Sequence, residues 1–318
     1  MKQKRYFRTF TKFNSILVLA VLLHTACTED LTSGMTESPI TFTIDGNSFE
    51  ASGITRGAQV GSISNFGVSA SVYDKDAVGG YTSAGCGSYF YNQSATNGTP
   101  MNYYWPTSDY KVSFYAYYPY GNSAFTVQSA ANSNGIPTYA YTVPEAIASQ
   151  VDVMTAQVTD RLASNHSAVP LFFAHRCTDI RFTAYNQQSD PLTVKSVAIY
   201  GVKYSGTYTN GNAWTLSGSA NSSSSHPFLL SLNTTIAAET TVDLTGTTNH
   251  FIMLPQTVPN GTDFLVVKTL EDGEEKTYTY TLANNYELIM GKSVTFRLIL
   301  GNGTITINPV TVVDWQAQ

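Results

Sequence analysis

Short segments in which apolar and polar residues alternate are the feature that most constrains the fold of this chain. Apolar side chains at every second position of residues 66–72 predict a strand with one apolar face, and aromatic side chains on both faces of residues 110–120 predict a central strand. The dipeptides Asp272-Gly273 and Asn302-Gly303 are typical of two-residue hairpin turns. Long stretches of helical period are missing from the sequence. The pattern therefore predicts an all-β fold of stacked sandwiches and excludes a parallel α/β protein.

The length of 318 residues fits two domains of about 100–200 residues each. A polar stretch at residues 160–167 precedes a strongly apolar strand, and we place the domain boundary there. The predicted layout is a signal peptide at residues 1–27, a removable strand segment at 28–56, an N-terminal β-sandwich at 57–165, and a C-terminal β-sandwich at 166–318 with a candidate donor strand at 304–315. Residues 74–100 are expected to loop over the surface.

The first 27 residues have the layout of a secretion signal. Five of the 17 basic residues lie within the first 12 positions, and the apolar run 16–23 and then Ala26-Cys27 follow. The run is too short to span a membrane, which needs about 20 apolar residues. Small residues before a cysteine resemble a bacterial lipobox, so Cys27 is predicted to be lipidated; ordinary signal cleavage is the alternative. After Cys27 the chain has 12 basic and 22 acidic residues, which argues against nucleic acid as a partner.

The segment that follows the signal has the pattern of a detachable strand. Ile40, Phe42 and Ile44 alternate with threonines, as in a half-buried strand. Arg56 is the only basic residue between Cys27 and Lys75, and glycines flank it, so we predict proteolytic processing between Arg56 and Gly57. An ordinary surface arginine is the alternative. Removal of this strand would leave an apolar groove that another chain could fill.

The end of the chain carries a similar pattern. Ile305 and Ile307 alternate with threonines, and Val310 and Val312 follow beyond Pro309. This pattern resembles that of Ile40, Phe42 and Ile44, so the segment is a candidate donor strand for the groove that removal of residues 28–56 would open. Pro309 lacks a backbone N–H and should therefore lie on an edge strand or at a bend. The alternative is that the segment completes its own C-terminal sandwich.

The sequence gives little sign of catalysis or metal binding. The histidines past the signal are scattered, and neither a nucleophile elbow nor a Gly-rich phosphate loop is present. His175 and Cys177 would share one face of a strand, but a metal site needs more ligands than these two. Whether Cys86 and Cys177 pair is left open, with two separate buried thiols as the simpler interpretation. We predict a protein that is not an enzyme and needs no cofactor.

Several motifs, taken in their order along the chain, resemble the fimbrillin family of Bacteroidales type V pili. They are the lipobox cysteine, Thr55-Arg56-Gly57, Tyr104-Trp105-Pro106, the aromatic block at residues 112–119, the segment 152–156, residues 171–180 with His175, and a terminal Val-Asp-Trp. The resemblance covers essentially the whole chain. It implies two transthyretin-like β-sandwich domains, a palmitoylated lipoprotein precursor exposed on the outer membrane, cleavage by a trypsin-like protease, and assembly with other fimbrial subunits by strand donation.

A lipid-anchored surface protein that binds glycans is the alternative function. The chain has 21 tyrosines, and tyrosine rings on a surface can stack on sugars while their hydroxyls stay in water. The two functions differ at the N-terminus, because a glycan-binding protein would keep residues 28–56 whereas a fimbrial subunit would lose them.

Overall fold

The computed structural model describes residues 35–44, 63–82, 86–128, 136–209, 211, 213–301 and 304–315. Within these residues the chain is built of strands, joined by loops and by the short 3-10 turns η2 (Gly80–Thr82) and η3 (Ile147–Ser149). The predicted all-β fold is confirmed. Cys27, Arg56 and Gly57 lie outside the described residues.

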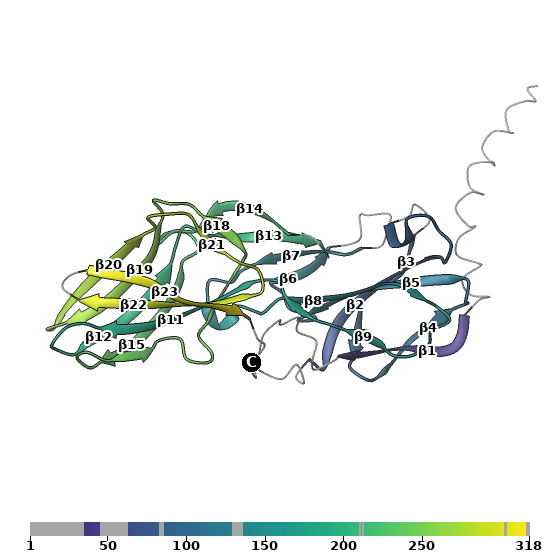
Figure 1. Cartoon of the computed structure of the whole chain (residues 1–318), viewed down its shortest axis with the longest axis horizontal. Helices are drawn as coiled ribbons and strands as arrows, with labels where there is room; N and C mark the ends of the chain where they lie inside the picture. The colour runs from purple at the N-terminus through teal and green to yellow at the C-terminus, as the bar shows by residue number, and fades with distance from the viewer. Residues whose placement is uncertain are drawn as a thin grey trace, which may run out of the picture.

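The strands form two lobes along the long axis of the molecule (Figure 1). Among the described residues, the first lobe has two sheets. The larger has the strand order β10 (Ala174–His175), β8 (Met154–Leu162), β5 (Tyr110–Tyr118), β2 (Asn65–Asp74), β3 (Gly87–Thr96). The smaller has the strand order β4 (Pro100–Pro106), β1 (Met35–Ile44), β9 (Val169–Leu171). Their apolar faces enclose one hydrophobic core. β5 lies between β8 and β2, as predicted for a strand with aromatic side chains on both faces.

The second lobe contains more sheets than the first, and they surround a second hydrophobic core. One has the order β16 (Thr241–Asp243), β11 (Thr178–Asn186), β22 (Lys292–Gly301), β23 (Thr304–Asp314), with β17 (Phe251–Met253) also on β11. The next has the order β15 (Phe228–Ile236), β12 (Leu192–Ile199), β19 (Asp263–Glu271), β20 (Glu274–Thr281). A third sheet has the strand order β14 (Trp214–Ala220), β13 (Lys203–Thr209), β7 (Thr138–Thr142), β6 (Phe125–Gln128). β18 (Gln256–Val258) and β21 (Tyr286–Leu288) form a separate two-stranded sheet.

The predicted domain boundary between residues 165 and 166 does not coincide with the change of strand partners. β9 and β10 follow it in sequence, yet they pair with β1 and β8 of the first lobe. β6 and β7 precede it, yet β7 pairs with β13 of the second lobe. Tyr139 and Tyr141 of β7 are buried in the second core, which explains why this segment crosses over. A polar stretch marks a turn in the chain, and it carries no information about which sheet the flanking strands join.

One expectation about a segment between strands was wrong. Residues 74–100 were expected to form a surface loop, but they contain β3, which pairs with β2. The apolar face predicted for β2 is buried, and Ser69 and Ser71 on its other face are buried as well. Short polar side chains suit either a solvated or a covered face of a sheet, so alternation alone does not distinguish the two. Cys86 and Cys177 are both buried and are not joined in a disulfide.

A buried carboxylate stabilises the hairpin between β19 and β20. Asp272 and Gly273 have φ angles of 53° and 82°, as the predicted two-residue turn requires. Beside the turn, the side chain of Glu271 is 1% exposed. It accepts hydrogen bonds from Gln188, Thr269, Lys276 and Tyr278. Burial alone would raise the pKa of Glu271, but these hydrogen bonds outweigh it and lower this pKa to about 2.

Glu271→Gln is therefore expected to lower the free energy of unfolding at pH 7 by about 1.5–3 kcal/mol, as is usual for hydrogen bonds to a charged group. Because the pKa is lower in the folded than in the unfolded chain, the stabilisation is fully present above about pH 4.5 and is lost as the pH falls toward 2. Urea denaturation at pH 7 and pH 3 measures this, with the exposed Glu274→Gln on the same hairpin as control. A wild-type advantage that does not shrink at pH 3 would contradict the assignment.

Candidate functional site

The first described strand lies between two others in the first lobe. β1 pairs antiparallel with β4, with Pro39 opposite Tyr104. On its other side it pairs parallel with β9, with Phe42 opposite Val169. The three strands lie side by side at the lower edge of the first lobe (Figure 1). Without β1, neither β4 nor β9 would have a partner in this sheet, and an unfilled strand position would lie between them.

The side chains of β1 show how this position is filled. Ile40 and Phe42 are completely buried, Thr43 is exposed and Ile44 is half-buried, so the predicted alternation is confirmed. The Phe42 ring packs edge-on against Phe66, at a centroid distance of 5.9 Å, and against Phe114 at 5.2 Å. Burial of each such side chain contributes about 1.5–3 kcal/mol. A strand in this position therefore needs apolar residues at alternate positions.

The predicted donor segment lies in the second lobe. β23 pairs antiparallel with β22 along its whole length and forms the edge of that sheet. The register shifts at Pro309, which confirms the expected edge position and break. Ile307 is buried and Ile305 is half-buried, whereas Val312 is 49% exposed. Nothing is described for the side chain of Val310. In the single chain, the segment thus completes its own sheet, which is the alternative left open by the sequence.

Trp315 follows β23 and fixes its end. Its side chain is 6% exposed and stacks on the imidazole of His175, with a centroid distance of 4.4 Å and an angle of 14° between the rings. The Trp315 backbone N–H donates to the carbonyl of Gly291 at 2.9 Å. His175 belongs to β10 in the first lobe, so this contact joins the two lobes. The terminal Val-Asp-Trp was noticed in the sequence, but its contact with His175 was not predicted.

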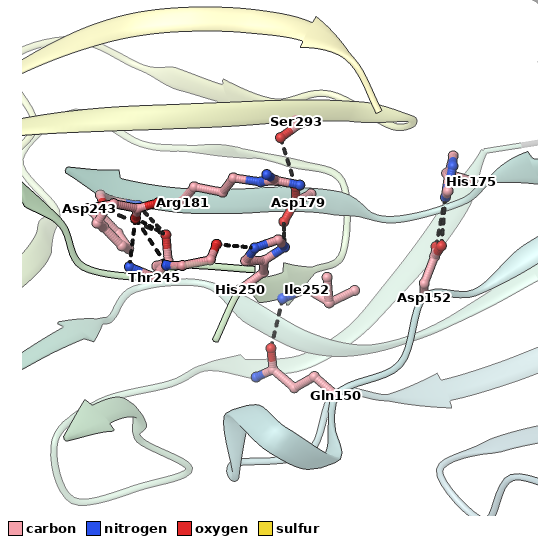
Figure 2. Close-up of polar contacts among 12 residues, drawn as sticks. Gln150, Asp152, His175, Asp179, Arg181, Asp243, Thr245, His250, Ile252 and Ser293 are labelled. Atoms are coloured by element: carbon pink, nitrogen blue, oxygen red, sulfur yellow. Dashed lines mark hydrogen bonds and ion pairs between the residues drawn. The ribbon is translucent and has the colours of Figure 1, made fainter. Parts of the chain in front are cut away.

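Figure 2 shows a polar cluster where β11, β22 and the segment before β17 meet. The Asp179 side chain is fully buried. Its carboxylate accepts hydrogen bonds from Arg181 Nε and Ser293 Oγ, both at 2.7 Å, and lies 3.3 Å from His250 Nδ1. Burial alone would raise the pKa of Asp179, but contacts with His250, Ser293 and Arg181 together lower it below its usual value. Asp179 therefore acts as an anionic anchor between segments that are distant in sequence.

A second carboxylate–imidazole pair lies nearby (Figure 2). Asp152 contacts Nδ1 of His175 at 2.8–2.9 Å. Burial raises the pKa of Asp152, and the contact with His175 partly offsets this effect. A surface pocket of about 260 Å³ separates the two pairs and is lined by Asp152, Arg181, His250 and Trp315 among others. Within the described residues, no three His, Cys, Asp or Glu side chains are arranged to hold a metal ion. The polar groups here support the fold where the lobes join.

A model of the fimbrillin-like family matches residues 55–315. The chain belongs to the fimbrillin-like family. A search of the curated proteins gives no significant match.

One solved structure shares the fold of this fimbrillin-like chain, and another is similar over most of its length. A protein named as a cell adhesion protein from Bacteroides ovatus is 18% identical, with a TM-score of 0.56, and the match covers 88% of this chain and 98% of that one. A fimbrial assembly protein from Parabacteroides distasonis is 13% identical, with a TM-score of 0.40, and the match covers 86% and 97% of the two chains. In the described part of the fimbrillin-like chain, no helix is long and apolar enough to cross a membrane.

Proposed function

We propose that this chain is a structural or adhesive subunit of a type V fimbria, exported as a lipoprotein anchored through Cys27. A trypsin-like protease cleaves it between Arg56 and Gly57, β1 leaves, and subunits polymerise by strand exchange. Its partners are other fimbrial subunits, and before processing the outer membrane. The observation that carries this proposal is the position of β1, whose Ile40 and Phe42 are fully buried between β4 and β9.

The donor in this proposal is the segment 304–315 of a neighbouring subunit. Its Ile305 and Ile307 have the same spacing as Ile40 and Phe42, so they fit side-chain positions that β1 vacates. β23 is an edge strand, held to its own sheet through β22 alone. An edge strand can leave its sheet without breaking pairs on two sides, whereas a central strand cannot.

The burial of the aromatic side chains supports the fimbrial function over the glycan-binding one. Five of the largest fully buried side chains are tyrosines: Tyr73, Tyr115, Tyr139, Tyr141 and Tyr208. These rings are used in packing and are not available to stack on a sugar.

Blocking the cleavage tests the proposed function directly. In cells that assemble the fimbria, Arg56→Gln should leave an uncleaved chain that stays monomeric on a denaturing gel run without heating, where the wild type gives a ladder. Lys75→Gln is the control, because it removes the next basic residue beyond Arg56 and should polymerise normally. Polymer built from uncleaved Arg56→Gln chains would overturn the proposal.

Removal of the lipid-bearing residue tests the anchor. Cys27→Ala should release the chain from the membrane fraction and abolish labelling with fatty acid, because it removes the residue that carries the acyl chains. Stable anchoring needs two or more such chains. Fractionation of cells grown with labelled palmitate measures both effects. Membrane retention with label after the substitution would end the lipoprotein assignment.

A further inference from the structure

One short segment of the first lobe contacts strands from both ends of the described chain. Residues 169–171 form β9 and pair with β1, with Phe42 opposite Val169 and Ile44 opposite Leu171. Four positions beyond Leu171, His175 supports the ring of Trp315, the residue that follows β23. We name residues 169–175 the bridging segment. The strand to be removed and the strand to be donated are thus attached to opposite ends of the same seven residues.

Contacts between aromatic rings connect Phe42 of β1 to Phe173 of the bridging segment. Phe42 packs on Phe66 at 5.9 Å, and Phe66 packs on Phe173 at 5.6 Å. Phe173 is completely buried and lies two positions before His175. Loss of β1 would remove the Phe42 ring, which packs on Phe66, and would also remove the backbone pairing partner of β9. Both changes loosen the packing that holds Phe173 in place.

The His175 ring has a fixed orientation because of its neighbours in the first lobe. Its side chain is 2% exposed, and Nδ1 is held by the carboxylate of Asp152. The backbone of β10 is paired with β8, with His175 opposite Met154. The surface on which Trp315 stacks therefore depends on the position of β10, which continues directly from the bridging segment.

Trp315 in turn is the buried anchor for the second half of β23. Val312 and Val313 are each 49% exposed. Asp314 pairs with Lys292, but both side chains are more than a third exposed, and such ion pairs contribute little. Among the described side chains that follow Pro309, Trp315 is the buried one. Its release from His175 would leave this half of the strand held mainly by backbone pairing with β22.

We propose that the bridging segment couples the two ends of the chain. While β1 is in place, the segment holds the His175 ring as a platform for Trp315 and keeps β23 in its own sheet. When β1 leaves, the platform loosens and β23 is freed for pairing elsewhere. The use of this coupling in assembly rests on the proposed function, but the coupling itself is a property of the single, uncleaved chain.

Hydrogen–deuterium exchange of the uncleaved chain, read by mass spectrometry, tests the coupling. Phe42→Ala and Trp315→Ala should each raise the exchange rate of amides in residues 304–314 by about tenfold or more. Phe42→Ala should add little in a Trp315→Ala background, because the contact through which it acts is already lost. Trp315→Phe, which retains an aromatic ring on His175, should restore much of the protection.

Phe90→Ala is the matched control. It removes a ring of the same type from the same core, but Phe90 packs on Tyr103 and Phe114, so protection of residues 304–314 should be unchanged. If Phe42→Ala unfolds the first lobe, seen as fast exchange throughout β5, then Phe42→Leu is measured in its place. Unchanged protection of β23 in the Phe42 variants overturns the proposal, as does an equal effect with and without the Trp315 ring.

The outcome is separable from that of the proposed function. Exchange is measured on a monomer, so neither cleavage at Arg56 nor fibre formation affects it. A chain that shows the coupling but polymerises without cleavage would disprove the strand-exchange function alone. A chain that polymerises only after cleavage but shows independent ends would disprove the coupling alone.

Discussion

A chain that begins at Gly57 is expected to have a first lobe far less stable than that of the full chain. It lacks β1, and with it the burial of Ile40 and Phe42, each of which contributes about 1.5–3 kcal/mol. The backbone pairs of β4 and β9 with β1 are lost as well. Hydrogen exchange of β5, at the centre of the first lobe, should therefore accelerate, while exchange of β12 in the second lobe should not.

A synthetic peptide covering β1 should restore the protection of β5 in the shortened chain. Ligands that bind only the folded state stabilise it in proportion to the logarithm of their concentration, so protection should rise as peptide is added. The same peptide with Phe42→Ala is the control and should act only at much higher concentration. A shortened chain with full protection of β5 in the absence of peptide would show that β1 is dispensable and that no groove needs filling.

Asp179→Ala is expected to be the most destabilising single substitution in the second lobe. It removes the carboxylate that accepts hydrogen bonds from Arg181 and Ser293 and faces His250. Breaking a buried ion pair by removing one partner costs about 3–5 kcal/mol, because the remaining charge is left without compensation. Urea denaturation should show this loss as a lower midpoint with an unchanged slope.

Asp263→Ala is a suitable control for Asp179→Ala. Asp263 is exposed at the start of β19 and accepts a hydrogen bond from Thr281, so its replacement should change the unfolding free energy by about 0.5 kcal/mol or less. Asp179→Asn should fall between the two, since the amide oxygen can still accept a hydrogen bond. Equal midpoints for Asp179→Ala and Asp263→Ala would show that the anchor does not stabilise the lobe.

The sequence predicted features that depend on neighbouring residues alone, such as strand alternation, turn type and the position of a proline. The alternation around Phe42 is correct because a strand with one face on a core must alternate. The two-residue turn at Asp272-Gly273 is correct because few residues tolerate its positive φ angles. The edge position of Pro309 follows from its missing N–H in the same way.

Long-range partners could not be predicted in this manner. The carboxylate of Asp179 is satisfied by side chains from positions 250 and 293, and no periodicity links such positions. The stacking of Trp315 on His175 joins the two lobes. Likewise, β7 precedes the expected boundary but pairs with β13 of the second lobe. For the candidate site, the sequence predicted that both segments, β1 and β23, are strands, but not the residues that hold the second one in place.

The parallel pairing of β1 with β9 has a consequence for the order in which the chain folds. β1 comes early in the chain and can pair first with β4, but its other neighbour begins only at Val169, and contacts between positions so distant in sequence form slowly. During synthesis, the packing of Ile40 and Phe42 is therefore completed only after β2 to β8 have been made. Until Leu171 has been made, one edge of β1 has no partner, and an unpaired strand edge is open to mispairing with another chain.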